Sequence, residues 1–85
     1  MATDSKSVQR AFGETLRQAR VGLGLSQQDL ALEAELDRTY ISLLERGQRQ
    51  PTITTLIVLA KAMGVDSTEL LKRTVAALQP RHKGL

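Results

Sequence analysis

Glycine and proline interrupt this chain at intervals, and between the interruptions apolar residues recur every three or four positions. A recurrence of this kind places apolar side chains on one face of an α-helix. The residues that predict helix ends are Gly22, Gly24, Gly47, Gly64 and Pro80. The chain can therefore bury its apolar residues only as several short helices that pack against one another.

Residues able to cap an α-helix precede most of the predicted helices. They are Ser26 with Asp29, Asp37, Thr52, and Asp66 with Glu69. The predicted helices cover about residues 7–21, 27–34 and 38–46, the segment between Thr52 and Gly64, and the segment between Asp66 and Pro80. Residues 1–6 and the tail 80–85 are expected to be flexible ends of a single domain, residues 1–85.

The composition favours an all-α fold. Hydrophobic residues make up 41% of the 85 residues and aromatic residues only 2%. The core must therefore be aliphatic, which suits packed helices better than a β-sheet. A chain of this length can bury one modest core, but it is too small for a deep enzyme cleft. We predict a compact five-helix bundle.

The distribution of charge changes sign in the middle of the chain. Residues 26–37 contain four carboxylates and no basic residue, whereas residues 38–52 contain Arg38, Arg46 and Arg49 against Glu45 alone. With a net charge of +3, this bias indicates an anionic partner. A bias this small is equally compatible with an ordinary solvated surface.

The sequence lacks the motifs of an enzyme or of a cofactor site. The only histidine, His82, is in the tail, there is no cysteine, and neither a glycine-rich phosphate loop nor metal-ligand spacing is present. We therefore expect no catalysis, no metal and no cofactor. No segment has the length of a membrane span or the character of a signal peptide, so we expect a cytoplasmic protein without membrane contact.

From Phe12 to Leu71, the order of the motifs resembles the lambda repressor and Cro-like (Xre-type) helix-turn-helix DNA-binding family. The motifs are LRQAR, GLSQQDLA, YISLLERG, QRQP and LAKAMGV. The resemblance implies a helix-turn-helix at about residues 26–46 in a transcriptional regulator that binds double-stranded operator DNA without a small-molecule ligand.

Within this family, the controller proteins of restriction-modification systems are most similar, being single-domain proteins of similar size with a similar DRTYISLLERG-like helix. A phage-type repressor and an antitoxin-like regulator remain alternatives. A rival of another class is a helix-turn-helix fold that has become a protein-interaction module.

The resemblance places the DNA-reading helix at residues 38–46. The expected base contacts are Arg38, Thr39, Ser42 and Leu43. A guanidinium can bind guanine O6 and N7, hydroxyl groups can bind several base edges, and a leucine can pack on a thymine methyl. Two alternatives stay open, because Arg38 could instead pair with Glu35 on the surface and Leu43 could pack against Leu36.

Residues at the rims of this helix are expected to bind phosphates and so to fix position rather than sequence. Those that match the family's phosphate contacts are Gln27, Tyr40, Arg46, Gln48, Arg49 and Gln50. Tyr40 could instead cover the edge of the core. Gln27 opens the second helix of the motif, where free backbone N–H groups favour an anion.

The resemblance also implies two scaffold features. Arg20 and Glu45 correspond to a partly buried ion pair that some members have, so we expect a structural role for Arg20. Many members have glycine in the turn, where this chain has Glu35. If the backbone there keeps a positive φ, a residue other than glycine costs about 1 kcal/mol or more.

The last predicted helix has more apolar positions than a terminal helix needs for one core. We expect it to pair with the same helix of a second copy across a two-fold axis, which would suit a palindromic operator. The predicted interface residues are Val75 and Leu78, with Leu70 and Leu71 divided between core and interface. Alternatively, these residues only close the monomer's own core.

Overall fold

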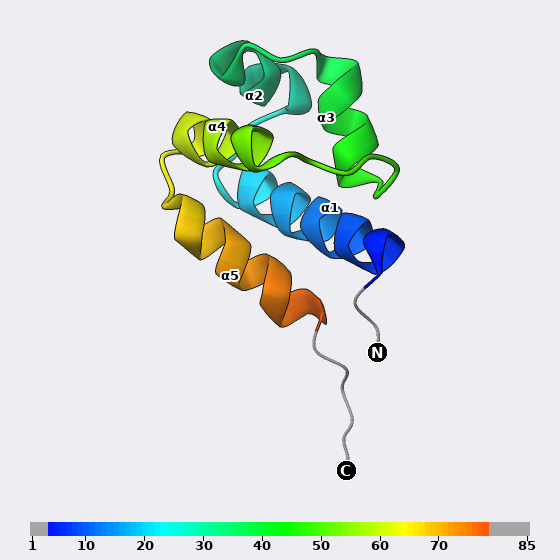
Figure 1. Ribbon diagram of the computed structural model, residues 1–85. Coiled ribbons are helices and arrows are strands. Elements are labelled where there is room, and N and C mark those ends of the chain that lie inside the picture. Colours follow the sequence, from blue (N-terminus) through cyan, green and yellow to red (C-terminus); the bar gives the residue numbers. More distant parts are fainter. Residues whose placement is uncertain (1–3, 79–85) are drawn as a thin grey trace.

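The computed structural model describes residues 4–78, which form five α-helices and no β-strand. The helices are α1 (Ser5–Gly22), α2 (Gln27–Ala34), α3 (Arg38–Glu45), α4 (Ile53–Met63) and α5 (Ser67–Leu78). In Figure 1, α2 and α3 lie together at one end of the molecule, α4 lies between α2 and α1, and α5 lies on the other side of α1. The prediction of an all-α five-helix bundle is confirmed.

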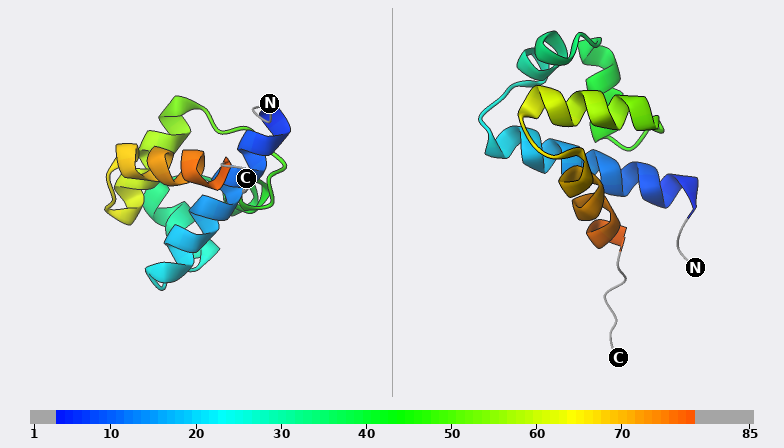
Figure 2. Two further views of the ribbon diagram at one scale, coloured as in Figure 1. Left: turned by 90° about the horizontal axis from the view of Figure 1, so that it is seen from below. Right: turned by 60° about the vertical axis from the view of Figure 1, so that its left-hand side comes forward.

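The five helices pack against one another through their apolar faces. Helix α1 packs against α5 and α3, α2 packs against α3 and α4, and α4 packs against α5. Figure 2 shows α5 crossing α1 on the side away from α2 and α3. Helix α1 is therefore central, because it supports the α2–α3 pair on one side and α5 on the other.

The core is aliphatic apart from a single phenylalanine. Its largest fully buried side chains are Phe12, Leu16, Leu30, Ile41, Leu44, Leu59 and Leu70. Each such side chain stabilises the fold by about 1.5 to 3 kcal/mol relative to an exposed one. Each of the five helices supplies buried side chains to one hydrophobic core. Within residues 4–78 this is the only large core, so the helix-turn-helix is part of it.

The capping residues define the helix starts. Ser26 and Asp29 form the predicted capping box, with 2.9 Å from the Asp29 amide to Ser26 Oγ and 3.0 Å from the Ser26 amide to Asp29 Oδ2. Hydrogen bonds to the Asp29 carboxylate, first from the Ser26 amide and then from the Ser26 side chain, lower the pKa of Asp29, because they stabilise its charged form. Thr52 caps α4 by accepting the Thr55 amide at 3.0 Å.

The structure differs from the predictions at the start of α1 and at the cap of α3. Helix α1 begins at Ser5 rather than at Ser7, because Asp4 accepts the Ser7 amide at 2.8 Å and caps the helix two residues earlier. The N-terminal segment predicted to be flexible is therefore partly helical. Asp37 occupies the N-cap position of α3, but its side chain makes no capping hydrogen bond. The predicted tail, residues 80–85, lies outside the described residues.

Gly13 allows α1 and α3 to approach closely, a feature that the helical pattern did not reveal. It is buried in the middle of α1, and a Cβ atom there would lie only 2.7 Å from the Glu45 carbonyl oxygen, with the Leu44 carbonyl oxygen closer still. Real side chains do not make such contacts with backbone atoms. Any larger residue at position 13 would push the C-terminal end of α3 away from α1.

Candidate nucleic-acid interface

A tight turn connects α2 to α3 and makes the pair a helix-turn-helix. Glu35 adopts the left-handed conformation, with φ of 57° and ψ of 44°, and is the single non-glycine residue with positive φ within residues 4–78. The Leu36 amide donates to the Ala31 carbonyl at 2.9 Å, and Leu36 packs against the core. Glu35 thus keeps the positive φ at which a residue other than glycine is strained, and Leu36 anchors the turn despite the missing glycine.

Helix α3 has one buried face and one outward face. Ile41 and Leu44 are each 0% exposed and fix the helix to the core. The outward face contains the four predicted base contacts, of which Arg38 and Thr39 are exposed and Ser42 and Leu43 are half-buried. The structure thus brings these four side chains together on one surface of a rigidly supported helix.

The structure decides one of the alternatives that the sequence left open, the pairing of Arg38 with Glu35. Arg38 makes no ion pair, because the two ion pairs among residues 4–78 join Arg20 to Glu45 and Arg73 to Glu69. The alternative pairing of Arg38 with Glu35 is therefore not formed.

Tyr40, on the flank of α3, behaves as a residue of the core edge. It packs against the core, and its hydroxyl oxygen lies 3.4 Å from Thr55 Oγ1 on α4. This long contact leaves the hydroxyl with further hydrogen-bonding capacity. A phosphate contact by Tyr40 remains a prediction.

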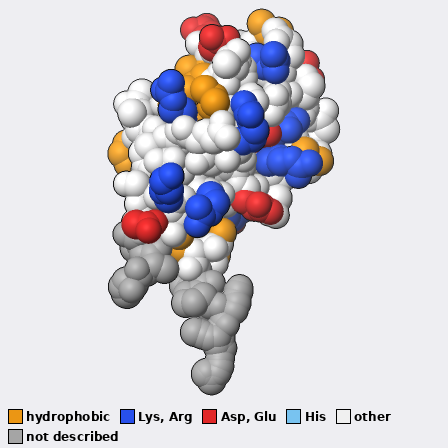
Figure 3. Space-filling model, turned by 90° about the vertical axis from the view of Figure 1, so that its right-hand side faces the viewer, with side chains coloured by type: hydrophobic (Ala, Val, Ile, Leu, Met, Phe, Trp, Pro, Cys, Tyr) orange, Lys and Arg blue, Asp and Glu red, His pale blue; other side chains and the backbone are white. Residues whose placement is uncertain are grey.

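A basic rim surrounds the outward face of α3. Arg38, Arg46 and Arg49 are exposed, as are Gln48 and Gln50 in the loop that follows α3. Figure 3 shows that Lys and Arg side chains predominate over carboxylates on this side of the molecule. Arg10 of α1 belongs to the same rim, because its Cγ and Cα atoms lie against Gly47, directly after Arg46.

Behind the rim, Arg20 and Glu45 form the predicted ion pair. Arg20 Nε donates to Glu45 Oε2 at 2.5 Å and Nη2 donates to Oε1 at 3.0 Å, while Nη1 donates to the Leu25 carbonyl at 2.7 Å. The two side chains are only 12% and 3% exposed. The hydrogen bond to Glu45 raises the pKa of Arg20, although burial opposes this. Arg20 is thus held by the scaffold and is not part of the basic rim.

Gln27 is positioned differently from the simple phosphate contact that the resemblance implied. Its side chain is half-buried, and Nε2 donates to Glu45 Oε1 at 3.0 Å. Sequence reasoning missed this bond because the two residues are 18 positions apart and their types alone do not indicate a contact. The Gln27 side chain therefore joins the ion pair behind α3.

The apolar surface on α5 is narrower than predicted. Leu70 is 1% exposed and belongs to the monomer's core, so of the pair Leu70 and Leu71, predicted to be divided between core and interface, Leu70 is the core member. Leu71 and Val75 are 47% and 49% exposed, and Ile53 of α4, which the sequence analysis did not single out, is 72% exposed. Leu71 and Ile53 line one groove of about 390 Å³ between α1, α4 and α5.

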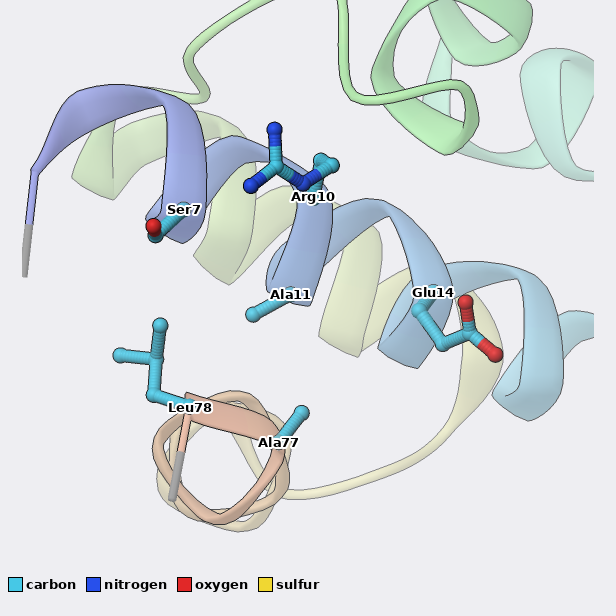
Figure 4. Close-up of a pocket in the computed structure, with 6 residues that line it drawn as sticks. All are labelled: Ser7, Arg10, Ala11, Glu14, Ala77 and Leu78. Atoms are coloured by element: carbon cyan, nitrogen blue, oxygen red, sulfur yellow. The ribbon is translucent and has the colours of Figure 1, made fainter. Parts of the chain in front are cut away.

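A second hollow lies between the start of α1 and the end of α5 (Figure 4), with a volume of about 400 Å³. Leu78 points toward Ser7 of α1 there, so the fourth predicted interface residue is directed partly at its own chain. The polar side chains of Arg10 and Glu14 extend away from each other, as Figure 4 shows. The hollow thus lacks a pair of polar groups converging on one point.

The described residues offer neither a metal site nor a membrane span. Within residues 4–78, no three His, Cys, Asp or Glu side chains lie close enough to hold a metal ion. None of the five described helices combines the length and the apolar character needed to cross a bilayer.

The chain is similar to known proteins over most of its length. A family model described as helix-turn-helix matches residues 16–70. The control protein C.BamHI of Bacillus amyloliquefaciens is 38% identical over 71 residues, which are 82% of this chain and 88% of that protein.

Solved structures agree with the sequence comparison. The restriction-modification controller protein C.AhdI of Aeromonas hydrophila is 40% identical, with a TM-score of 0.71 over 73% of this chain and 94% of that one. The controller protein C.Esp1396I, solved as a tetramer in complex with its natural 35 base-pair operator, is 30% identical, with a TM-score of 0.77 over 84% of this chain and 93% of that one.

Proposed function

The chain belongs to the Xre-type helix-turn-helix family, and we propose on that basis that it is a transcriptional regulator that binds a specific operator in double-stranded DNA. One observation carries the proposal: the outward face of α3 combines hydrogen-bonding and small apolar groups, while Ile41 and Leu44 hold its other face in the core. An α-helix fits the major groove of B-form DNA, where each base pair has its own pattern of donors and acceptors.

In this proposal, the residues of the interface have two kinds of role. Arg38 binds guanine at the start of α3, Thr39 and Ser42 contact base edges through hydroxyl or methyl groups, and Leu43 packs on a thymine methyl. The rim residues bind phosphates. They are Arg46 and Arg49 as charged contacts, with Gln27, Tyr40, Gln48 and Gln50 as neutral donors.

We further propose that the protein binds its operator as a homodimer through α5. Leu71, Val75 and Ile53 form an exposed apolar surface beside the groove between α4 and α5. A second copy of the chain is the proposed occupant, because the related C.Esp1396I is a tetramer on its operator and a two-fold axis lets one surface cover itself. Two reading helices would then lie about 34 Å apart, one turn of DNA.

The relatives support a role of the proposed regulator in the control of a restriction-modification system. C.AhdI and C.Esp1396I are restriction-modification controller proteins and C.BamHI is a control protein, and this chain spans most of the length of each. We propose that the protein controls the genes of such a system and acts in the cytoplasm, together with the DNA that it binds.

The experiment that tests this function is selection from a pool of random DNA duplexes. The purified protein is mixed with the pool, bound duplexes are recovered and amplified over several rounds, and the survivors are sequenced. An inverted repeat with half-sites about one helical turn apart is the expected result. Survivors without a common sequence, or no recovered DNA, would favour the protein-interaction rival.

A further inference from the structure

Glu45, the last residue of α3, is the meeting point of three helices. Its carboxylate accepts two hydrogen bonds from Arg20 of α1, at 2.5 and 3.0 Å, and one from Gln27 of α2, at 3.0 Å. The Glu45 side chain is 3% exposed. A carboxylate so far out of water needs these donors, and in return it fixes the side chains that supply them.

This cluster lies at the open end of the helix-turn-helix. The two helices are connected covalently through Glu35 and Leu36 at one end, where Leu30, Ala34 and Ile41 also pack in the core. Gln27 is the first residue of α2 and Glu45 is the last of α3, so both are at the end farthest from the turn. Their hydrogen bond therefore limits how far the two helices can splay.

We propose that Gln27 is a positioning residue for α3, and that its bond to Glu45 couples the phosphate anchor at the start of α2 to the orientation of the DNA-reading helix. This inference deepens the proposed function and rests on it. A primary amide has two N–H donors. One holds Glu45 and the other can reach a phosphate, so the same amide sets the distance between the DNA backbone and α3.

The physical consequence is a difference between specific and random DNA. Base readout needs the α3 side chains within hydrogen-bonding distance of particular base edges, whereas phosphate binding tolerates small rotations. If the Gln27–Glu45 bond is lost while the Arg20–Glu45 pair remains, α3 gains freedom to tilt. Affinity for the operator should then fall more than affinity for unrelated DNA.

The test compares three proteins: the wild type, Gln27→Met and Gln28→Met. Methionine has nearly the length of glutamine but donates no hydrogen bond. Gln28 is the matched control, because it is the next residue of α2, is exposed and takes the same substitution. Dissociation constants are measured at one salt concentration by fluorescence anisotropy, for the duplex selected above and for a shuffled duplex of the same length.

We expect Gln27→Met to lower the ratio of the two affinities about tenfold, the effect of losing one hydrogen bond to a charged group. Gln28→Met should leave the ratio within about twofold of the wild type. An unchanged ratio would overturn the inference: if both affinities fell equally, Gln27 would act only on phosphates, and if neither fell, it would not contribute to binding. A wild type that does not distinguish the two duplexes would instead overturn the proposed function.

A second variant keeps the inference testable if Gln27→Met does not fold, which circular dichroism would reveal. In Gln27→Lys, the ammonium group can still donate to Glu45 while attracting both duplexes alike. The expected result is a ratio close to that of the wild type, with tighter binding overall. A lysine variant that folds and loses discrimination would contradict a positioning role for this hydrogen bond.

Discussion

The Arg20 guanidinium donates two hydrogen bonds to the Glu45 carboxylate, at 2.5 and 3.0 Å, on the inner side of the reading helix. This two-point geometry is the strong form of the Arg–carboxylate pair. Both charges are largely out of water, so removing either side chain is expected to destabilise the fold. The remaining charge would be left buried without a partner.

Replacing Arg20 with methionine should therefore lower the free energy of unfolding by about 3 kcal/mol, the cost of stranding a buried charge. Urea denaturation measures this directly. Arg73→Met is the control, because Arg73 pairs with Glu69 at 3.2 Å on the surface, where the two side chains are 50% and 46% exposed. The control should lose less than about 1 kcal/mol. Equal losses would refute the structural role of Arg20.

Because α1 and α3 approach closely at Gly13, a substitution of this glycine should strongly destabilise the fold. In Gly13→Ala, the new methyl group would meet backbone carbonyls of α3, so we expect a destabilisation of about 3 kcal/mol or more. Gly22→Ala is the matched control, since Gly22 ends the same helix and a Cβ atom there would meet nothing within 4 Å. Thermal melting should show a large fall for the first variant and little change for the second. The reverse order would mean that the helices are spaced differently.

Substitutions of two arginines should affect DNA binding differently, one lowering sequence specificity and the other lowering affinity for all DNA. Arg38 opens α3 on its outward face, whereas Arg49 lies in the loop after it. Arg38→Ala should relax discrimination at one base pair of each half-site, by about 1 to 3 kcal/mol. Arg49→Ala should weaken all sequences alike and reduce the salt dependence by about one phosphate contact. Binding titrations on single-base variants of the operator give both quantities. Identical effects of the two changes would remove Arg38 from the base contacts.

The α5 surface predicts the state of association. The wild type should sediment as a dimer at micromolar concentration, and Val75→Asp should be monomeric, because a carboxylate would be buried against its symmetry mate. Ala76→Asp, also exposed on α5, is the charge-matched control and should remain dimeric. A monomeric wild type would eliminate this interface, as would a Val75→Asp protein that still dimerises.

The sequence was sufficient to predict the helices and the two faces of α3. Gly47 and Gly64 indicate where helices end, and the capping box of Ser26 and Asp29 indicates where α2 begins. Both signals are readable because helix capping and termination depend on residues close together in the chain. Ile41 and Leu44 indicate the buried face by spacing alone. Local physical chemistry fixes all of these features.

Features that depend on contacts between distant segments could not be predicted in the same way. The buried Gly13 resembles any tolerated glycine in a helix until α3 is placed against it. Leu70 and Leu71 are adjacent and equally apolar, yet one is 1% and the other 47% exposed. That difference depends on the rotation of α5 about its axis, which packing against α1 and α4 sets.

The central claim, that α3 reads a DNA sequence, is tested most directly by one ratio of affinities. Fluorescence anisotropy at a single near-physiological salt concentration gives the dissociation constants of the wild type for its selected duplex and for a shuffled duplex of the same length and composition. The account predicts binding to the selected duplex at least about 10³ times tighter. Equal affinities for the two duplexes would contradict it, because phosphate contacts alone would then explain all of the binding.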